Sequence, residues 1–322
     1  MRIVLDLQGA QSDSRFRGIG RYSLGLARAI AQVATQHEVW LVLSGRYPES
    51  VVPLSEGFAN LIPRKRIRVF ELPGPVAELD PRNSWRMQAA QLLREKFLSD
   101  LRPDIVHMST LFEGFHNEVV TSVGRLNKNI PTAVTLYDLI PLLHPERFLT
   151  DALTKRCYLR RAQSLKQADL LLAISESSRR EAIEKLQILP ERITNIGSGV
   201  SPWFSSAHAS PGSKTALLER LGLRKPFVLY IGNMEPHKNL ERLIEAFSLL
   251  RRELRTAHQL AVVGNVNQEQ GWRLISRYSL RGYRRRISSL LATHPMKISV
   301  FCTVRAPSLC SLRCMRVSGS PW

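Results

Sequence analysis

Short runs of apolar and β-branched residues alternate with amphipathic stretches along the first 200 residues. The runs predict strands at 2–7, 39–44, 66–72, 104–108, 132–139, 169–175 and 192–197. Helical spacing of apolar residues predicts helices between them, at 21–33, 83–101, 150–167 and 177–187. Near-continuous apolar strands that alternate with helices indicate a parallel sheet covered on both faces. The predicted fold class is therefore α/β, with a complete Rossmann-like domain over residues 1–200.

The composition changes after this domain, where glycine, serine and proline become frequent, and we predict an interdomain linker at 201–220. A strand at 227–232, a helix at 238–250 and a strand at 259–264 are predicted next. One face of this helix carries the apolar residues Leu240, Leu243, Ile244, Phe247 and Leu250. A βαβ unit of this kind opens a second Rossmann-like domain, which we expect to be incomplete and to occupy 221–276.

The charge balance is strongly basic, with 46 Lys and Arg against 27 Asp and Glu and a net charge of +19. Such a balance is compatible with sugar nucleotides, anionic lipid headgroups or nucleic acid as partners. We expect no nucleic acid, because the chain has no nucleic-acid motif and no basic patch interleaved with aromatic residues. Cys and His spacings predict neither a disulfide framework nor a metal site. With no signal-peptide pattern and no apolar run of membrane-spanning length, a cytoplasmic location is expected.

Three positions near strand ends are candidates for chemistry in the first domain. Gly18, Gly20 and Arg21 join the first strand to the first helix, where glycine permits close approach of a ligand and the helix start attracts anions. A tight connection is the alternative. Asp138 follows a strand and could orient a sugar hydroxyl or move a proton, or simply cap the next turn. His107 ends another strand, either as a catalyst or as a hydrogen-bonded structural residue.

The segment 232–239 links the first strand of the second domain to its helix, and it contains the cation Lys238. A lysine at a helix start is unfavourable by the macrodipole argument, unless an anion such as a diphosphate binds there. A solvated lysine is the alternative interpretation.

Four segments in order carry a family resemblance: RIVLDLQGAQ…RGIGRYS, YDLIPLLHPERF, LLLAISESSRRE and YIGNMEPHKNLERLIEAF. They resemble the retaining family-4 glycosyltransferases of the GT-B fold, and are most similar to bacterial members that add mannose or related sugars to surface polysaccharides such as lipopolysaccharide. The resemblance covers residues 1–276. It implies an N-terminal acceptor domain and a C-terminal domain that binds a nucleoside-diphosphate sugar, most plausibly GDP-mannose, with no further cofactor. Saccharide or lipid-linked acceptors, and peripheral contact with an anionic membrane at its inner face, are the expected partners.

Carried over by position, the resemblance places the loop of Gly18, Gly20 and Arg21 in the cleft, with Asp138 and His107 as acceptor-side candidates. The donor diphosphate is assigned to Lys238, Gly232, Asn233 and His237. Two features depart from the family pattern. Asn233 and His237 stand where the family often has arginine, and neutral histidine is no bidentate donor. The acidic donor-site motif, a Glu before Gly-Phe-Gly-Leu-Pro, is absent.

The segment 277–322 has nine Lys and Arg and no acidic residue, unlike the chain before it. When its codons are read one base over, allowed codon choices give a sequence ending VFPSVHEGFGLPV, which contains the missing motif. We therefore predict that 277–322 is an out-of-frame tail, that the chain is truncated in this sense, and that transfer is impaired. The alternatives are a non-catalytic remnant that binds acceptor only, and a basic nucleic-acid-binding protein.

Overall fold

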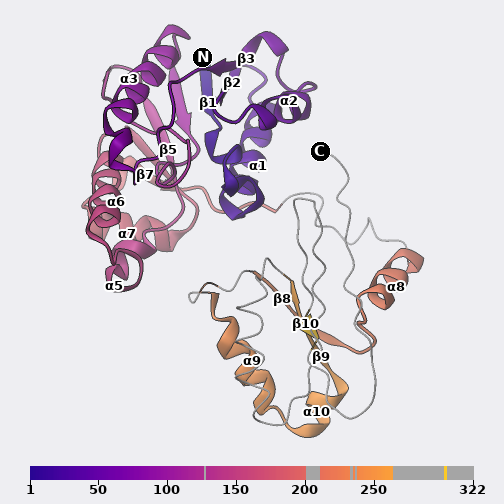
Figure 1. Ribbon diagram of the computed structural model, residues 1–322. Helices are drawn as coiled ribbons and strands as arrows, with labels where there is room; N and C mark the ends of the chain where they lie inside the picture. Colours follow the sequence, from indigo (N-terminus) through magenta and orange to yellow (C-terminus); the bar gives the residue numbers. More distant parts are fainter. Residues whose placement is uncertain (127, 201–210, 233–234, 236–237, 264–300, 303–322) are drawn as a thin grey trace. The chain divides into compact units, whose positions relative to one another are not determined.

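The computed structural model describes residues 1–126, 128–200, 211–232, 235, 238–263 and 301–302 (Figure 1). The chain divides into two compact units between residues 201 and 202, and each is described by itself.

The first unit is built on a seven-stranded sheet in the order β3-β2-β1-β4-β5-β6-β7, in which every pairing is parallel. The strands are β1 (Arg2–Asp6), β2 (Glu38–Ser44), β3 (Ile67–Phe70), β4 (Ile105–Met108), β5 (Thr132–Leu136), β6 (Leu170–Ala173) and β7 (Ile193–Asn195). The ends of each strand lie within three residues of the ends of a predicted strand, so this part of the prediction is confirmed. The order reverses between β1 and β4, and ligands of open parallel sheets bind at such a switch point.

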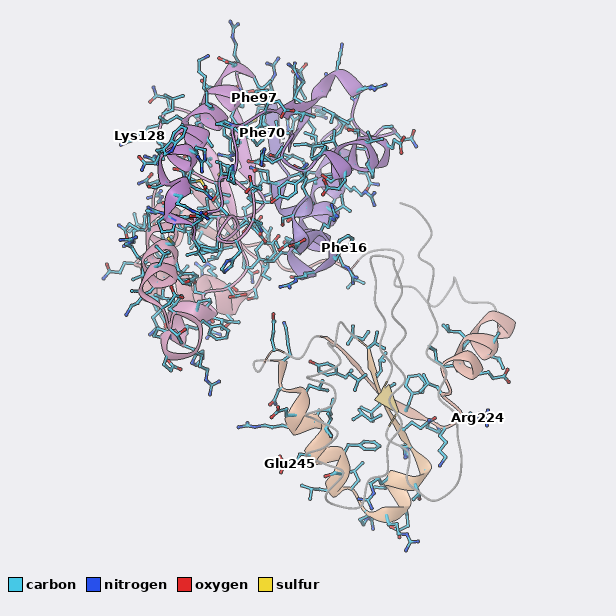
Figure 2. All side chains as sticks on the ribbon, in the orientation of Figure 1. Phe16, Phe70, Phe97, Lys128, Arg224 and Glu245 are labelled. Atoms are coloured by element: carbon cyan, nitrogen blue, oxygen red, sulfur yellow. The ribbon has the colours of Figure 1, made fainter. Side chains whose placement is uncertain are left out.

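Helices cover both faces of this sheet (Figure 1). They are α1 (Gly18–Val33), α2 (Pro48–Gly57), α3 (Ser84–Asp100), α6 (Ala152–Leu165) and α7 (Glu176–Leu186), with the short α4 (Ile140–Leu143) and α5 (Pro145–Phe148). Successive β1 residues Val4 and Leu5 belong to different hydrophobic clusters, as alternation along a strand requires. On one face, Phe70 of β3 lies with its ring centroid 5.8 Å from that of Phe97 of α3 (Figure 2).

The connection from β4 to β5 differs from its neighbours, because its described residues, 109–126 and 128–131, form no helix. Polar side chains hold it against the end of β1. Gln8 Nε2 donates to the Val120 carbonyl over 2.9 Å, and the Val120 amide donates to Gln8 Oε1 over 3.0 Å. Beneath them, Arg94 Nε donates to Asp6 Oδ2 over 2.8 Å in a fully buried ion pair. The extended connection is thus anchored without a helix of its own.

The second unit contains a three-stranded sheet, β10-β9-β8, in its described part. Here β8 (Phe227–Ile231) and β9 (Gln259–Val263) pair parallel, while β10 (Phe301–Cys302), from the predicted out-of-frame tail, pairs antiparallel with β9. The predicted face of α9 (Leu240–Leu249) packs as expected, since Leu240, Leu243, Ile244 and Phe247 contact Leu260 and Val262. Leu250 follows the helix and is exposed.

Two further helices were not predicted in this unit. Helix α8 (Pro211–Arg220) occupies half of the segment predicted as a linker, and α10 (Arg252–Ala257) follows α9. The linker prediction rested on Gly, Ser and Pro content, whereas the residues from 214 onward are mostly good helix formers. The leucines of this region, Leu218, Leu221 and Leu223, pack on Ala261 of β9. Burial of these leucines on the sheet therefore favours a helix here, although the preceding segment is rich in Gly, Ser and Pro.

Candidate functional site

The candidate site of the first unit lies at the carboxyl ends of β1 and β4, where the strand order reverses. The turns η1 (Gln8–Ala10) and η2 (Asp13–Phe16) follow β1 and lead into α1. The segment after β4 lies against them, because the Gly9 amide donates to Ser109 Oγ over 3.3 Å. A Cβ at Gly9 would lie 3.0 Å from the same oxygen, so glycine gives the two segments room for their close approach.

Glu113 joins these two segments, and the sequence analysis did not identify it. Its carboxylate is buried and accepts hydrogen bonds from Ser12 Oγ at 3.3 Å, from Asn117 Nδ2 at 2.9 Å and from the Ser14 hydroxyl. A signal was present in the sequence, since Glu113 is the only Asp, Glu, Lys or Arg between residues 105 and 117. A lone acid after an apolar strand requires partners when buried, and here it positions the turn before α1.

The two glycines at the start of α1 serve different purposes. A Cβ at Gly20 would lie 2.3 Å from the Ser14 carbonyl oxygen, so Gly20 makes the tight connection that was the alternative interpretation. A Cβ at Gly18 would meet nothing within 4 Å, and Gly18 is exposed. The first turn of α1 contains no acidic residue, and Arg17, the N-cap, gives it no side-chain cap. Gly18 and exposed Arg21 therefore leave the helix start open to an anion.

Tyr137, just after β5, binds this helix start. Its hydroxyl lies 2.9 Å from Ser23 Oγ and donates to the Ile19 carbonyl over 3.2 Å, and its ring packs edge-on against Tyr22 at 5.5 Å. Burial raises the pKa of Tyr137, so the hydroxyl stays protonated. Asp138 comes next and is exposed, and its Oδ1 accepts from the Ile140 amide over 3.1 Å. It thus caps the following turn, while its other oxygen accepts no hydrogen bond from the described residues.

His107 lies inside the sheet, away from the exposed edge that carries Asp138. Its side chain is buried, and Nε2 lies 2.8 Å from Thr135 Oγ1 of the neighbouring strand. Burial lowers the pKa of His107 to about 4, which leaves the imidazole neutral at physiological pH. The geometry matches the hydrogen-bonded structural role that the sequence analysis considered for it.

The donor-side candidates are partly described. Asn233 and His237 lie outside the described residues. The Gly232 amide extends the β8–β9 ladder by donating to the Val263 carbonyl over 2.9 Å. Lys238 is exposed, and the Tyr230 hydroxyl donates to its carbonyl over 3.3 Å. Helix α9 starts directly after Asn239, which has φ 58° and gives no side-chain cap. The first amides of α9 and the Lys238 ammonium therefore lie within one short segment.

In the part of the chain that the structure describes, no group of three or more His, Cys, Asp and Glu side chains is arranged to hold a metal ion. Nor does any described helix combine the length and apolar character needed to cross a membrane.

Comparison with known proteins agrees with this architecture. Residues 16–204 match Glycosyltransferase Family 4, and residues 217–287 match Glycosyl transferases group 1. The chain is 33% identical over 276 residues to the serotype-specific mannosyltransferase WbdA of Escherichia coli, covering 85% of this chain and 33% of WbdA. It is 32% identical over 126 residues to the E. coli O-antigen chain mannosyltransferase B, covering 38% of this chain and 32% of that protein. The chain thus spans about one third of the length of these relatives.

Among solved structures, Anabaena Alr3699/HepE in complex with UDP and glucose superposes with a TM-score of 0.52 at 17% identity. The match covers 88% of this chain and 66% of that chain. At this identity the likeness concerns the fold alone, and it confirms the predicted GT-B-like α/β class.

Proposed function

The chain belongs to Glycosyltransferase Family 4, and on that premise we propose that it transfers mannose from GDP-mannose to a saccharide or lipid-linked acceptor of a surface polysaccharide. The observation that carries the choice of sugar is the 33% identity to the mannosyltransferase WbdA over 276 residues. Because the chain spans a third of that relative, the proposal concerns a single transfer step.

On the acceptor side, we assign the saccharide to the edge formed by the ends of β1, β4 and β5. Gly18 leaves room for close approach, and Arg21 adds positive charge at the start of α1. The carboxylate of Asp138 has an oxygen that accepts nothing from the described residues, and a sugar hydroxyl is a suitable donor to it. His107 supports this edge from within the sheet and does not contact substrate in this assignment.

On the donor side, we assign the diphosphate to Lys238 and the first amides of α9. Glycosyl transfer breaks the bond between the sugar and the diphosphate, so negative charge develops on the leaving group. A lysine ammonium and the start of a helix both stabilise that charge. Gly232, Asn233 and His237 complete the assigned loop, and retention of anomeric configuration follows from the family resemblance.

Two expectations from the sequence accompany this function as proposals. The net charge of +19 supports peripheral contact with the anionic inner face of the cytoplasmic membrane. The absence of the acidic donor-site motif supports impaired transfer. The alternative of an acceptor-binding remnant stands beside this proposal.

The test is a transfer and binding assay on the purified full chain. Radiolabelled GDP-mannose and UDP-glucose are each offered with a fluorescent mannose disaccharide, and GDP-mannose binding is measured by calorimetry. Transfer from GDP-mannose supports the proposed activity and refutes an inactive chain, whereas acceptor binding without transfer supports the remnant. Preference for UDP-glucose contradicts the proposed donor. Lys238→Ala is expected to weaken GDP-mannose binding about tenfold, through loss of a charge-assisted contact. Lys214→Ala, on exposed α8, is the matched control.

A further inference from the structure

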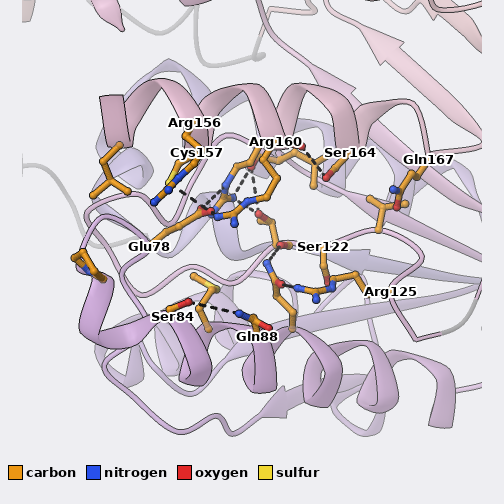
Figure 3. A pocket seen from close by; sticks show the side chains of 18 residues that line it. Glu78, Ser84, Gln88, Ser122, Arg125, Arg156, Cys157, Arg160, Ser164 and Gln167 are labelled. Atoms are coloured by element: carbon orange, nitrogen blue, oxygen red, sulfur yellow. Dashed lines mark hydrogen bonds and ion pairs between the residues drawn. The ribbon is translucent and has the colours of Figure 1, made fainter. Parts of the chain in front are cut away.

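A pocket of about 750 Å³ lies in the first unit between α3 and α6, beside the connection from β4 to β5 (Figure 3). The other strand connections from β1 to β6 place at least one helix against the sheet, but this one has none in its described residues. The gap between α3 and α6 is therefore lined by an extended segment. We call this space the α3–α6 pocket. Its arginine and glutamate lining consists of Glu78, Arg125, Arg156, Arg160 and Arg161.

The lining has a charge excess, because it contains four arginines and the single carboxylate of Glu78. Arg161 is buried, and its Nε donates to Glu78 Oε2 over 2.7 Å while its Nη1 donates to the Leu111 carbonyl over 2.6 Å. Arg160 pairs with the other oxygen of the same glutamate. Burial, and then the charge of Arg161, lower the pKa of Arg160. The buried Arg161 and Arg160 thus both pair with the carboxylate of Glu78, so this one negative charge balances only part of their combined positive charge.

The other two arginines have no acidic partner within the part of the chain that the structure describes. Arg125 donates to the neutral side-chain oxygen of Gln91. Arg156 is exposed and makes no hydrogen bond or ion pair with any described residue. Figure 3 shows Arg125, Arg156 and Arg160 around one space between the helices. Exposed guanidinium groups that line one space carry like charge, and a bound anion offsets their repulsion.

A residue with a buried hydroxyl also lines the same pocket. Ser122 lines it, is 7% exposed, and its Oγ has no hydrogen-bond partner among the described residues. Its backbone carbonyl accepts from Arg94 Nη1 over 3.2 Å, so its position is held from behind. A buried hydroxyl without a partner costs free energy.

We propose that the α3–α6 pocket binds a ligand bearing phosphate or pyrophosphate groups. Arginine presents a planar fork of donors that matches phosphate oxygens and is bidentate, and Arg125, Arg156 and Arg160 all line this one space. The volume lies within the usual range of small-molecule sites, roughly 300–1,000 Å³. The site is separate from the donor assignment, because every lining residue belongs to the first unit. It also does not require that the chain transfers a sugar.

Calorimetric titration of the full chain with inorganic pyrophosphate tests the proposal. Arg125→Gln, Arg156→Gln and Arg160→Gln are each expected to weaken binding about tenfold or more. Arg180→Gln, on exposed α7 outside the lining, is the matched control and keeps the original affinity. Circular dichroism of each variant verifies that it is folded. Absence of binding, affinities unchanged in the three variants, or equally tight binding of the tricarboxylate citrate would each overturn the proposal.

Two further arms identify the source of the phosphate. One uses soluble mannose 1-phosphate, and the other uses phosphatidylcholine vesicles with and without a polyprenyl pyrophosphate. Retention on the pyrophosphate vesicles alone, lost in the triple Arg→Gln variant, assigns a lipid headgroup. Binding of mannose 1-phosphate with equal loss in the triple variant assigns a soluble phosphate ester. Binding that persists in the triple variant contradicts the pocket as the site.

Discussion

Ser12 Oγ donates a hydrogen bond of 3.3 Å to Glu113 Oε2, although 101 residues separate the two in the sequence. Asn117 donates to the same carboxylate oxygen over 2.9 Å. The contact joins the turn after β1 to the segment after β4, which are the two connections that flank the reversal of strand order. The entry into α1 is therefore positioned by a buried carboxylate.

Glu113→Ala is expected to lower the free energy of unfolding by about 1–3 kcal/mol, because three polar groups lose a buried charged acceptor. Urea denaturation followed by circular dichroism measures this loss. Glu184→Ala, on an exposed face of α7, is the control and should change the unfolding free energy by less than about 0.5 kcal/mol. Equal effects of the two substitutions would contradict a positioning role for Glu113.

Gly20→Ala and Gly18→Ala form a matched pair within one helical turn. Alanine ordinarily stabilises a helix interior by roughly 0.5–1 kcal/mol relative to glycine. At Gly20, however, the new Cβ would lie 2.3 Å from backbone oxygen, so we expect a lower Tm. At Gly18 the space is open, and we expect an unchanged or slightly raised Tm together with weaker acceptor binding. Thermal unfolding and acceptor titration separate the two, and equal loss of stability in both would be evidence against the assignment.

Stability should fall with acidification through the buried imidazole of His107. The folded pKa of about 4 lies below the ordinary value of 6.5, so the unfolded chain binds more protons between these values. The contribution is present above pH 6.5 and is lost as the pH falls toward 4, with a limit of about 3 kcal/mol. His107→Gln does not titrate and should flatten this part of the curve in urea denaturation at pH 7.0, 5.5 and 4.5. A variant curve parallel to the wild type would exclude His107 as the cause.

The DNA at codon 276 tests the proposed out-of-frame tail. We expect that reading one base over beyond this codon encodes VFPSVHEGFGLPV near the end. Codons that cannot give that reading would refute the proposal. If they do give it, a gene repaired at codon 276 should yield a chain with higher transfer activity than the present one, because the acidic donor-site motif is then restored. Equal activity of the two chains would show that the acidic motif does not contribute to catalysis.

Much of the first unit could be predicted because its signals are local. Strands such as β5 and β6 are apolar runs bounded by polar residues, and α6 and α7 have helical spacing of their buried positions. Helix α2 was not predicted, since Pro53 lies inside it and interrupts the pattern. Helix α8 was missed because a segment rich in Gly, Ser and Pro precedes it. Tertiary packing on the sheet decided both cases.

The sequence was sufficient to locate the candidate site but not to distinguish the roles of its residues. Gly18 and Gly20 look equivalent in the sequence, and only the position of the Ser14 carbonyl distinguishes them. His107 and Asp138 both follow apolar residues near strand ends, yet one is inside the sheet and the other is exposed. The exposure of these two side chains depends on neighbouring strands that are distant in the chain, so the local sequence pattern does not distinguish them.

The sequence by itself determined the α/β class, the strands of the parallel sheet, the family and the basic charge, because periodicity, motif order and composition are properties of the chain alone. Only the tertiary structure decided that Glu113 joins two strand connections and that Arg125, Arg156 and Arg160 surround one pocket. Those groups come from segments far apart in the sequence. The strand order and a connection without a helix bring them together, and neither has a local signature.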